Sequence, residues 1–417
     1  MSIYTTITSC RSCQSKDIKD ILDLGNQYLS AFVDSEETPK SPLVLIICEN
    51  CKLVQLKHTT NSDLLYTDNY GYMSGINQTM KDELKDVVDK ALKISSVQNG
   101  DVVLDIGAND GSLLSNYNNN VLRVACEPIK KFRKLLVKYA DVIMGDFFSA
   151  SLYLKHSVTK PKVITAISCF YDLDDPNTFV QGIKEILDEN GVFVVQQNYL
   201  FEMIKNRAFD NIVHEHLEYY SLESLTNLLD RHNLEVFDVE LRNINGGSFR
   251  TYIRHKGGLP FRAGGEERIK KLRTIEYQHR LEDFNTYVFF ETEINQIKNR
   301  VFDLIKKEVK GGKKVYIYGA STRGSVILQY FDLNAETITA AAERNEEKWG
   351  KKTAGTNIPI VSEDEARRAN PDYFLCLPWF FKDEFIKREV KYLDKGGTLI
   401  FPLPKPVLVT KDGEVDL

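Results

Sequence analysis

Short apolar runs recur along the middle of the chain, and each ends in a turn rich in glycine or acidic residues. Residues 102–106 lead into Gly107 and Gly111, and residues 121–126 end at Glu127. Runs of this length between turn residues indicate buried strands, and their alternation with helical segments favours a parallel sheet. Further strands are expected at 142–144, 163–167 and 192–196, with helices at about 78–94 and 176–187.

A second unit of the same type begins near residue 313. Residues 315–318 predict a strand, residues 319–324 a glycine turn, and the residues from Ser325 onward a helix. A second strand at 337–341 leads to Glu343. Between the two units, residues 266–310 carry apolar residues at three- and four-residue steps, which predicts helices.

Composition narrows the class of protein only broadly. The chain has 417 residues, 42% hydrophobic and 27% charged, with a net charge of −5, which is typical of a soluble globular protein and favours neither nucleic acid nor an anionic membrane as a partner. No apolar run reaches the length of a membrane span, and the N-terminus lacks the pattern of a signal peptide. We therefore expect a cytoplasmic protein with no obligate protein partner.

Four of the seven cysteines form two C-x-x-C pairs, Cys10 with Cys13 and Cys48 with Cys51. Two such pairs supply the four thiolates of a closed tetrahedral zinc site, which favours a structural ion over a catalytic one. The residues around the pairs predict little apolar core, so the ion is expected to hold this segment together. Small core residues are the simplest interpretation of the other cysteines, which are Cys126, Cys169 and Cys376.

The first glycine turn reads D-x-G-x-x-x-G from Asp105 to Gly111. It resembles the first motif of S-adenosylmethionine (SAM) methyltransferases. An acid at the end of the following strand can accept both ribose hydroxyls. The predicted cofactor-binding residues are Asp105, Gly107, Asn109, Gly111 and Glu127, together with Asp146 and Phe147, whose position suits adenine or a simple turn.

His214, Glu215 and His216 follow the fifth strand of the first unit. Residues two apart point in different directions, so a metal site is not favoured. One alternative is a structural role before a helix that starts near Ser221. The other is a general base near the methyl donor, because histidine titrates near neutrality and a carboxylate can tune it.

Two further turns are candidates for substrate contact. Asn245, Gly246 and Gly247 predict a hairpin, which explains the glycines alone but also offers Ser248 and Arg250 to a polar substrate. The second glycine turn frees backbone amides at a helix N-terminus, where anions bind. The candidates there are Gly319, Ser321, Arg323 and the acid Glu343.

Together these motifs resemble the nucleotide-sugar C-methyltransferase family over essentially the whole length. The matching segments are the paired cysteines and residues 70–74, 105–111, 214–216, 246–250, 318–320, 355–360 and 377–384, which include Trp379. The resemblance implies methylation of a carbon next to the ketone of a TDP-linked keto-deoxyhexose. It implies His216 as the base, with Glu215, His214 and Tyr72 beside it, and Tyr70 and Trp379 at the substrate.

Two positions depart from the pattern of that family. Val213 stands where the family has tyrosine, so a hydroxyl is missing and the methylated position is open. Arg323 stands where lysine is common, which keeps the charge but changes its geometry.

We therefore expect an α/β protein of four parts. They are a zinc-binding module (1–65), a Rossmann-like SAM-dependent methyltransferase domain (66–260), a helical connector (261–310) and a second Rossmann-like domain that binds the sugar nucleotide (311–417). C-methylation through an enolate is the main hypothesis. O- or N-methylation of a related metabolite and a non-catalytic binding protein are the alternatives.

Overall fold

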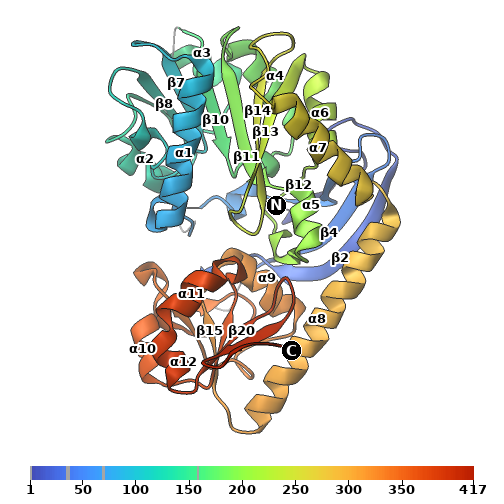
Figure 1. Ribbon diagram of the computed structural model, residues 1–417, viewed down its shortest axis with the longest axis vertical. Helices are drawn as coiled ribbons and strands as arrows, with labels where there is room; N and C mark the ends of the chain where they lie inside the picture. Colours follow the sequence, from blue (N-terminus) through green and yellow to red (C-terminus); the bar gives the residue numbers. More distant parts are fainter. Residues whose placement is uncertain (1, 34–37, 68–70, 157–158) are drawn as a thin grey trace.

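Two α/β lobes lie one above the other, with a long helix along one side and a small sheet between them (Figure 1). The computed structural model describes residues 2–33, 38–67, 71–156 and 159–417. The long helix, α8 (Phe284–Lys310), leads from the upper lobe down the side of the lower one. Within the described residues, every helix is too short or too polar to span a bilayer.

The upper lobe contains a seven-stranded sheet in the order β13-β14-β11-β10-β7-β8-β9. One of its inner strands, β7 (Val102–Ile106), pairs in parallel with β8 (Leu122–Cys126) and with β10 (Val163–Ile167). The strand order reverses between β7 and β10, and such a reversal leaves a crevice at the carboxyl ends of the strands. The other strands are β9 (Val142–Met144), β11 (Val192–Asn198), β13 (Leu234–Arg242) and β14 (Ser248–His255).

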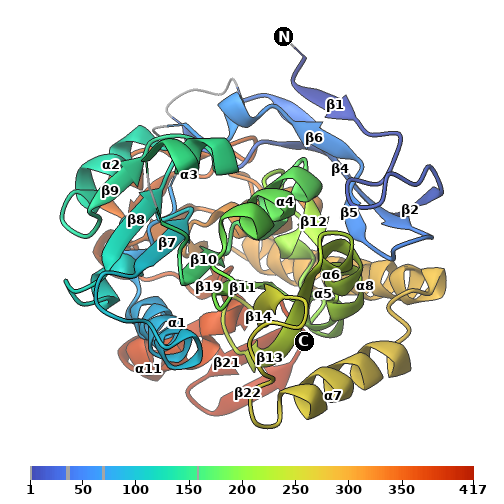
Figure 2. The same cartoon turned by 90° about the horizontal axis from the view of Figure 1, so that it is seen from above.

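Helices cover both faces of this sheet (Figure 2). Because successive side chains of a strand point to opposite faces, Val103 packs with the cluster that contains α1, and Leu104 with the cluster that contains α4 and α6. Ser221 caps α6 at its N-terminus. The helices are α1 (Gln78–Ser95), α2 (Lys130–Leu136), α3 (Ala150–His156), α4 (Pro176–Ile186), α5 (Leu200–Lys205), α6 (Leu222–Asp230) and α7 (Gly265–Gln278).

The N-terminal segment forms a four-stranded sheet that a strand of the upper lobe completes. Its order is β12-β5-β4-β2, and β12 (Glu218–Tyr219) comes directly after the His-Glu-His segment. The other strands here are β2 (Ile18–Tyr28), β4 (Lys40–Cys48), β5 (Val54–Leu56) and the separate pair β1 (Tyr4–Thr6) and β6 (His58–Thr60).

The expectation of little apolar core in this segment is wrong. Leu22, Leu45 and Leu56 are buried in one cluster with Phe290 and Ile294 of α8. The apolar side chains of β2 and β4 therefore pack against α8, more than two hundred residues away in sequence. A local count of apolar residues misses this contact.

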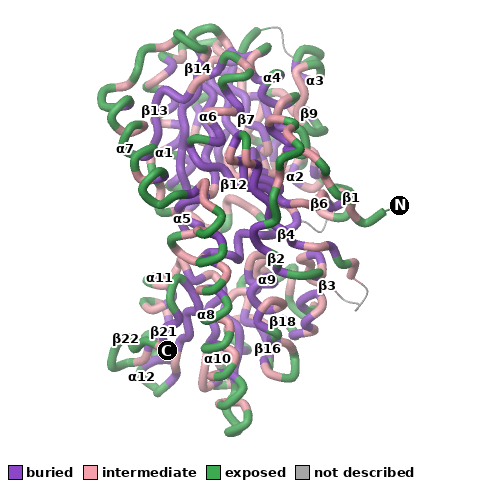
Figure 3. Tube along the Cα trace, turned by 90° about the vertical axis from the view of Figure 1, so that its right-hand side faces the viewer, coloured by how far each residue is buried: buried purple, intermediate pink, exposed green. Residues whose placement is uncertain are grey.

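The lower lobe contains a second seven-stranded sheet, in the order β18-β16-β15-β19-β20-β21-β22. Buried residues run through the sheets of both lobes (Figure 3). The strands are β15 (Val315–Tyr318), β16 (Ala340–Glu343), β18 (Ile360–Ser362), β19 (Tyr373–Cys376), β20 (Thr398–Phe401), β21 (Val407–Thr410) and β22 (Gly413–Asp416), with a small pair, β3 (Phe32–Val33) and β17 (Lys352–Thr353), beside them. The helices are α9 (Thr322–Tyr330), α10 (Glu363–Arg368), α11 (Lys382–Arg388) and α12 (Val390–Asp394).

The predicted fold class, two Rossmann-like units after a cysteine-rich module, is confirmed. Two boundaries in the lower lobe differ from expectation. The helix α9 begins at Thr322 because the Ser321 hydroxyl caps it by accepting from the Gly324 amide at 3.0 Å. The second strand begins at Ala340, since residues 337–339 belong to the preceding turn.

Candidate functional site

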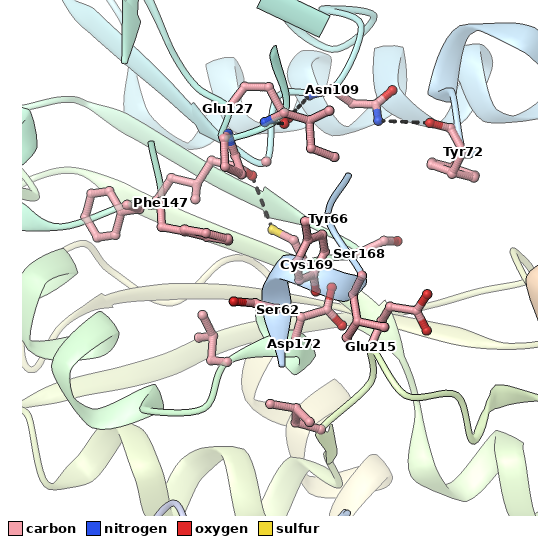
Figure 4. Close-up of a pocket in the computed structure, with 18 of the residues that line it drawn as sticks. Ser62, Tyr66, Tyr72, Asn109, Glu127, Phe147, Ser168, Cys169, Asp172 and Glu215 are labelled. Carbon is pink, nitrogen blue, oxygen red and sulfur yellow. Dashed lines mark hydrogen bonds between the residues drawn. The ribbon is translucent and has the colours of Figure 1, made fainter. Parts of the chain in front are cut away.

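A cavity of about 730 Å³ opens at the carboxyl ends of β7, β8 and β10. One end is formed by the first glycine turn, and the other by residues of the N-terminal module and of the His-Glu-His segment (Figure 4). The module contributes Ser2, Tyr4, Thr5, Thr59, Thr60, Asn61, Ser62, Leu65 and Tyr66 to the wall. The cavity therefore lies where a doubly wound sheet binds its ligand, beneath a wall supplied by another part of the chain.

The glycine turn is held by the acid at the end of the next strand. Gly107 has φ +71, and a side chain there would meet the Cys169 sulfur at 3.0 Å. Glu127 accepts hydrogen bonds from the backbone amides of Asn109 and Ile129, both at 2.8 Å. Each carboxylate oxygen has a further lone pair for a ligand hydroxyl. Burial raises the pKa of Glu127, although the two amides oppose that shift.

Most of the predicted cofactor-binding residues line the cavity. Asp146 instead accepts from the Phe147 amide in its own turn, at 2.8 Å. Gly111 packs against Tyr139, whose ring a side chain at position 111 would meet at 2.7 Å. The residues in the lining are Asp105, Gly107, Asn109, Glu127 and Phe147.

The cavity is acidic. Among the described residues that line it there is no lysine or arginine, and five are carboxylic acids. This lining favours a cationic ligand over an anionic one. Burial raises the pKa of Asp105 to about 7, although a hydrogen bond from the Thr165 hydroxyl at 2.6 Å opposes the shift. The acids are Asp105, Glu127, Asp172, Asp174 and Glu215.

A short segment before α1 closes over the glycine turn. The Ser74 amide donates to Asn109 Oδ1 at 3.1 Å, and Asn109 Nδ2 donates to the Tyr72 carbonyl at 3.2 Å. The Tyr72 side chain lines the cavity and is 44% exposed, so it is accessible to a ligand. Tyr70, the other tyrosine predicted here, lies outside the described residues.

The His-Glu-His segment divides between two environments. His214 and Glu215 line the cavity, whereas His216 borders a much smaller internal space with Asn198 and Tyr219. His214 is buried and its Nε2 contacts the Ser41 carbonyl at 2.9 Å. Burial lowers the pKa of His214 to about 4 and raises that of Glu215 to about 7.

His216 is held by one of its two ring nitrogens. Its Nδ1 contacts the Asn211 carbonyl at 2.8 Å, and its ring packs edge-on against Tyr171. A carbonyl only accepts, so Nδ1 carries the proton and Nε2 the lone pair. Burial lowers the pKa of His216 to about 3, so the ring is neutral at pH 7.

Asp172 is a cavity residue that the sequence analysis passed over. It lies close to Glu215 and Tyr66 (Figure 4). Its Oδ1 is buried without a hydrogen-bond partner among the described residues, and so is Glu215 Oε2. Burial, and then the charge of Glu215, raise the pKa of Asp172 well above its ordinary value. The only available signal was its position at the end of β10.

The second glycine turn repeats the geometry of the first. Gly319 has φ +87, and the Ala320 amide donates to Glu343 Oε2 at 3.0 Å, as the Asn109 amide does to Glu127. Lys348 fills the space beside this turn and donates to the Ala320 carbonyl at 2.8 Å. The two turns thus share a backbone arrangement but differ in the charge around them.

The other candidates for substrate contact are engaged with protein groups. Arg323 pairs with the fully buried Asp210 of the upper lobe at 2.7 Å, and Trp379 Nε1 donates to the same carboxylate at 3.1 Å. Arg250 is fully buried and pairs with Glu83 at 2.7 Å, and Ser248 donates to a backbone carbonyl at 3.0 Å. The pair of Arg323 with Asp210 thus connects the two lobes. The substrate contacts predicted for Arg323, Trp379, Arg250 and Ser248 stay predictions.

The four predicted metal-ligating cysteines converge. Their sulfur atoms all lie within 4.8 Å of one another, with Cys10 to Cys51 and Cys13 to Cys48 each at 3.5 Å. Sulfurs bound to one tetrahedral zinc at about 2.3 Å lie roughly 3.8 Å apart, so this set fits a zinc ion. Cys126 and Cys169 belong to or pack against the core of the upper lobe, as expected, and both also line the cavity.

Three family models match the chain in sequence order. "Putative zinc binding domain" matches residues 10–66, "Methyltransferase domain" residues 76–239, and "C-methyltransferase C-terminal domain" residues 243–404. The C-methyltransferase NovU of Streptomyces niveus is 28% identical over 378 residues, which are 89% of this chain and 88% of NovU.

Solved structures match less than half of this chain, at low identity. A SAM-dependent methyltransferase from Clostridium acetobutylicum is 11% identical and covers 42% of this chain and 91% of its own, with a TM-score of 0.33. The N-methyltransferase NodS from Bradyrhizobium japonicum is also 11% identical, covers 43% of this chain and 98% of its own, and has a TM-score of 0.33.

The fold, the acidic cavity at the glycine turn and the matched methyltransferase domain define a SAM-dependent methyltransferase that carries a four-cysteine zinc site. Within that class, the chain carries regions that match, in sequence order, a zinc-binding domain, a methyltransferase domain and a C-methyltransferase C-terminal domain.

Proposed function

We propose that the enzyme methylates a carbon next to the ketone of a nucleotide-linked sugar. Its family and the name of NovU support transfer to carbon. The acidic cavity suits a cationic sulfonium, while the second turn offers a helix N-terminus, with Lys348 beside it, to a diphosphate. We assign the donor to the domain at 66–260 and the nucleotide to that at 311–417.

His216 is the proposed base, and the fixed tautomer of its ring is the observation that carries this assignment. The Asn211 carbonyl holds the proton on Nδ1, and no described residue forms a hydrogen bond at Nε2. A neutral ring with a free Nε2 is the form that can accept the proton of an acidic C–H bond, although a pKa of about 3 makes His216 a weak base in the free protein. The residue before it, Glu215, lines the donor cavity, which supports the proposal that the acceptor carbon approaches His216 from that side.

Glu215 is the proposed partner of the substrate oxygen. A carboxyl whose pKa burial raises to about 7 is largely protonated below neutral pH and can donate a hydrogen bond to the ketone. That bond strengthens as the oxygen gains charge in the enolate. Tyr72 is a second donor from the opposite wall.

The proposed reaction has two steps, proton removal and methyl transfer. His216 Nε2 takes the proton from the carbon next to the ketone, and the electron pair of that C–H bond is shared with the ketone oxygen in the enolate. The same carbon then uses this pair as a nucleophile. That carbon forms a bond to the methyl group, and the S–CH₃ pair returns to sulfur. SAM supplies an activated methyl group when bound, so orientation by the protein contributes much of the acceleration.

The test is mass spectrometry of products formed from SAM and a panel of TDP-, GDP- and UDP-linked keto sugars. Transfer of a methyl group to carbon, located by NMR of the product, supports the proposal. Methylation at oxygen or nitrogen would replace it with the alternative that the Val213 departure leaves open. Without SAM, exchange of the sugar C–H for solvent deuterium reports the enolate step alone.

His216→Asn separates the base from the rest of the site. We expect the variant to fold and to bind S-adenosylhomocysteine (SAH), while turnover and deuterium exchange fall at least about 100-fold, which is the lower range for loss of a general base. His156→Asn, at an exposed position on α3, is the matched control. Near-normal exchange in His216→Asn would remove His216 from the mechanism.

A further inference from the structure

Arg11, which lies between the first two cysteines, reaches from the metal cluster to the wall of the cavity. Its side chain is 2% exposed. The guanidinium donates to the Leu56 carbonyl at 2.5 Å, to the Thr59 hydroxyl at 2.7 Å and to Asp174 Oδ1 at 3.2 Å. Thr59 and Asp174 both line the cavity. One buried cation therefore fixes two wall residues that come from different parts of the chain.

The same arginine is tied to the cysteines. Its backbone amide donates to Gln55 Oε1 at 3.0 Å, and Gln55 Nε2 donates to the Cys10 sulfur at 3.1 Å. Gln55 is fully buried, so both contacts are shielded from water. The position of the guanidinium thus depends on the path of the Cys10–Cys13 loop, and an ion held by the four sulfurs would fix that path.

Residues of the upper lobe also form hydrogen bonds with the Cys10–Cys13 loop. Asn177 Nδ2 donates to the carbonyls of Arg11 and Ser12 at 2.9 and 2.8 Å, and Arg231 Nη2 donates to the Ser12 carbonyl at 2.8 Å. The loop is therefore ordered jointly by the metal cluster and by the domain that forms the donor cavity.

Loss of the ion would release several contacts together. The Cys10–Cys13 loop would lose its fixed path, and the four acceptors of the Arg11 guanidinium, which include Gln55 Oε1 at 3.4 Å, would lose a common donor. Asp174, whose side chain is 65% exposed, would turn to water, and Thr59 would lose the hydroxyl contact of 2.7 Å that it makes with Asp174. The wall would then have to be ordered by the ligand, at a cost in affinity.

We propose that Arg11 couples the zinc site to the methyl-donor cavity, so that zinc binding and donor binding strengthen each other. Arg11 acts as a positioning residue through Thr59 and Asp174 and does not take part in methyl transfer. Because coupling between two sites is reciprocal, a ligand in the cavity must tighten the hold on the ion by the factor by which the ion tightens the hold on the ligand.

The experiment follows zinc release from the full-length holoenzyme into excess chelator, with a chromogenic zinc indicator, with and without saturating SAH. We expect SAH to slow release by at least about fivefold, the lower end of typical coupling factors. Calorimetry on metal-replete and metal-depleted protein gives the reciprocal shift in the Kd of SAH.

Two variants interrupt the path at different points. Arg11→Lys keeps the charge but lacks the planar fork that spans four acceptors, and Thr59→Val removes only the bridging hydroxyl at similar volume. Both should retain one zinc per chain, while the protection by SAH falls below about twofold. Lys57→Gln, which breaks the exposed pair with Asp20 in the same module, is the control and should keep full protection.

Two results would overturn the coupling. One is a zinc-release rate in the unchanged protein that saturating SAH does not alter. The other is full protection in both Arg11→Lys and Thr59→Val. Thr59→Val changes a small side chain at the edge of the cavity, so it remains informative even if Arg11→Lys fails to fold.

Discussion

Glu127→Gln isolates the contact on which donor binding is predicted to depend most. In the free protein both carboxylate oxygens accept a backbone amide at 2.8 Å, which fixes the plane of the group and leaves one lone pair on each oxygen for a ribose hydroxyl. Glutamine keeps the volume but replaces one oxygen by an NH₂ group, which cannot accept from a hydroxyl.

The magnitude follows from what differs between the free and bound states. The clash between the new NH₂ and a backbone amide is present in both states and largely cancels in the affinity. One hydrogen bond to a charged group is lost only in the complex, at a cost of about 1.5–3 kcal/mol. At about 1.4 kcal/mol per factor of ten, the Kd of SAH should rise about 10- to 150-fold.

Isothermal calorimetry with SAH measures this change, and the second lobe provides a matched control. Glu343 holds the Ala320 amide at 3.0 Å in the same arrangement, so Glu343→Gln makes the same chemical change at the other turn. We expect its SAH affinity to stay within about twofold of the parent. A Glu127→Gln protein that binds SAH as tightly as the parent, or an equal loss in Glu343→Gln, would refute the assignment.

Two further predictions concern ionisable groups. Burial raises the pKa of Glu215 to about 7, so the protonated, donating form is present below that pH, and kcat at saturating SAM should fall as the pH rises above about 7. Glu215→Gln stays neutral and can donate a hydrogen bond, so its kcat should not fall above about pH 7. If kcat of this variant falls as in the parent enzyme, Glu215 is excluded as the source of the decline. Arg250→Met should lower the free energy of urea unfolding by about 3–5 kcal/mol, because Glu83 and Asp86 lose a buried partner. Arg123→Met, at a partly exposed surface pair, should cost less than about 1 kcal/mol, and equal losses would contradict this account.

The core strands could be predicted from the sequence because local pattern determines them. β7 is buried throughout and β8 and β9 are buried toward their carboxyl ends, so these strands appear in the sequence as short, mainly apolar runs. The glycine turn could also be predicted from the sequence. Gly107 and Glu127 belong to neighbouring elements, and their contacts depend on the backbone geometry of those elements.

The wall of the cavity could not be predicted in the same way. Thr59 and Tyr66 come from the N-terminal module, which pairs with β12 of the upper lobe and so lies beside the cavity. Asp172 gave no signal beyond its place at a strand end. These contacts depend on long-range packing, which no local spacing encodes.

For Arg250, the residue type suggested a ligand contact, but the structure shows its charge paired within the protein. An arginine after a glycine hairpin suits an anionic substrate by residue type, yet its charge is already balanced by Glu83 and Asp86 on α1. Both acids lie far from it in sequence. Residue type indicates which chemistry is available, whereas the packing of α1 against β14 determines whether a ligand can use it.

The two glycine turns show how one backbone arrangement can serve two ligands. In each, a turn amide is held by an acid at the end of the next strand, so the arrangement itself carries no preference for either ligand. The surroundings differ, because the first turn opens into a cavity with carboxylates and no described lysine or arginine, while Lys348 lies beside the second. A cationic donor and an anionic nucleotide would each be repelled at the other's turn. Under the proposed function the two charges are separated between the lobes, so that both ligands can bind at once, and we expect the carbon to be methylated to lie where the lobes meet, beside His216.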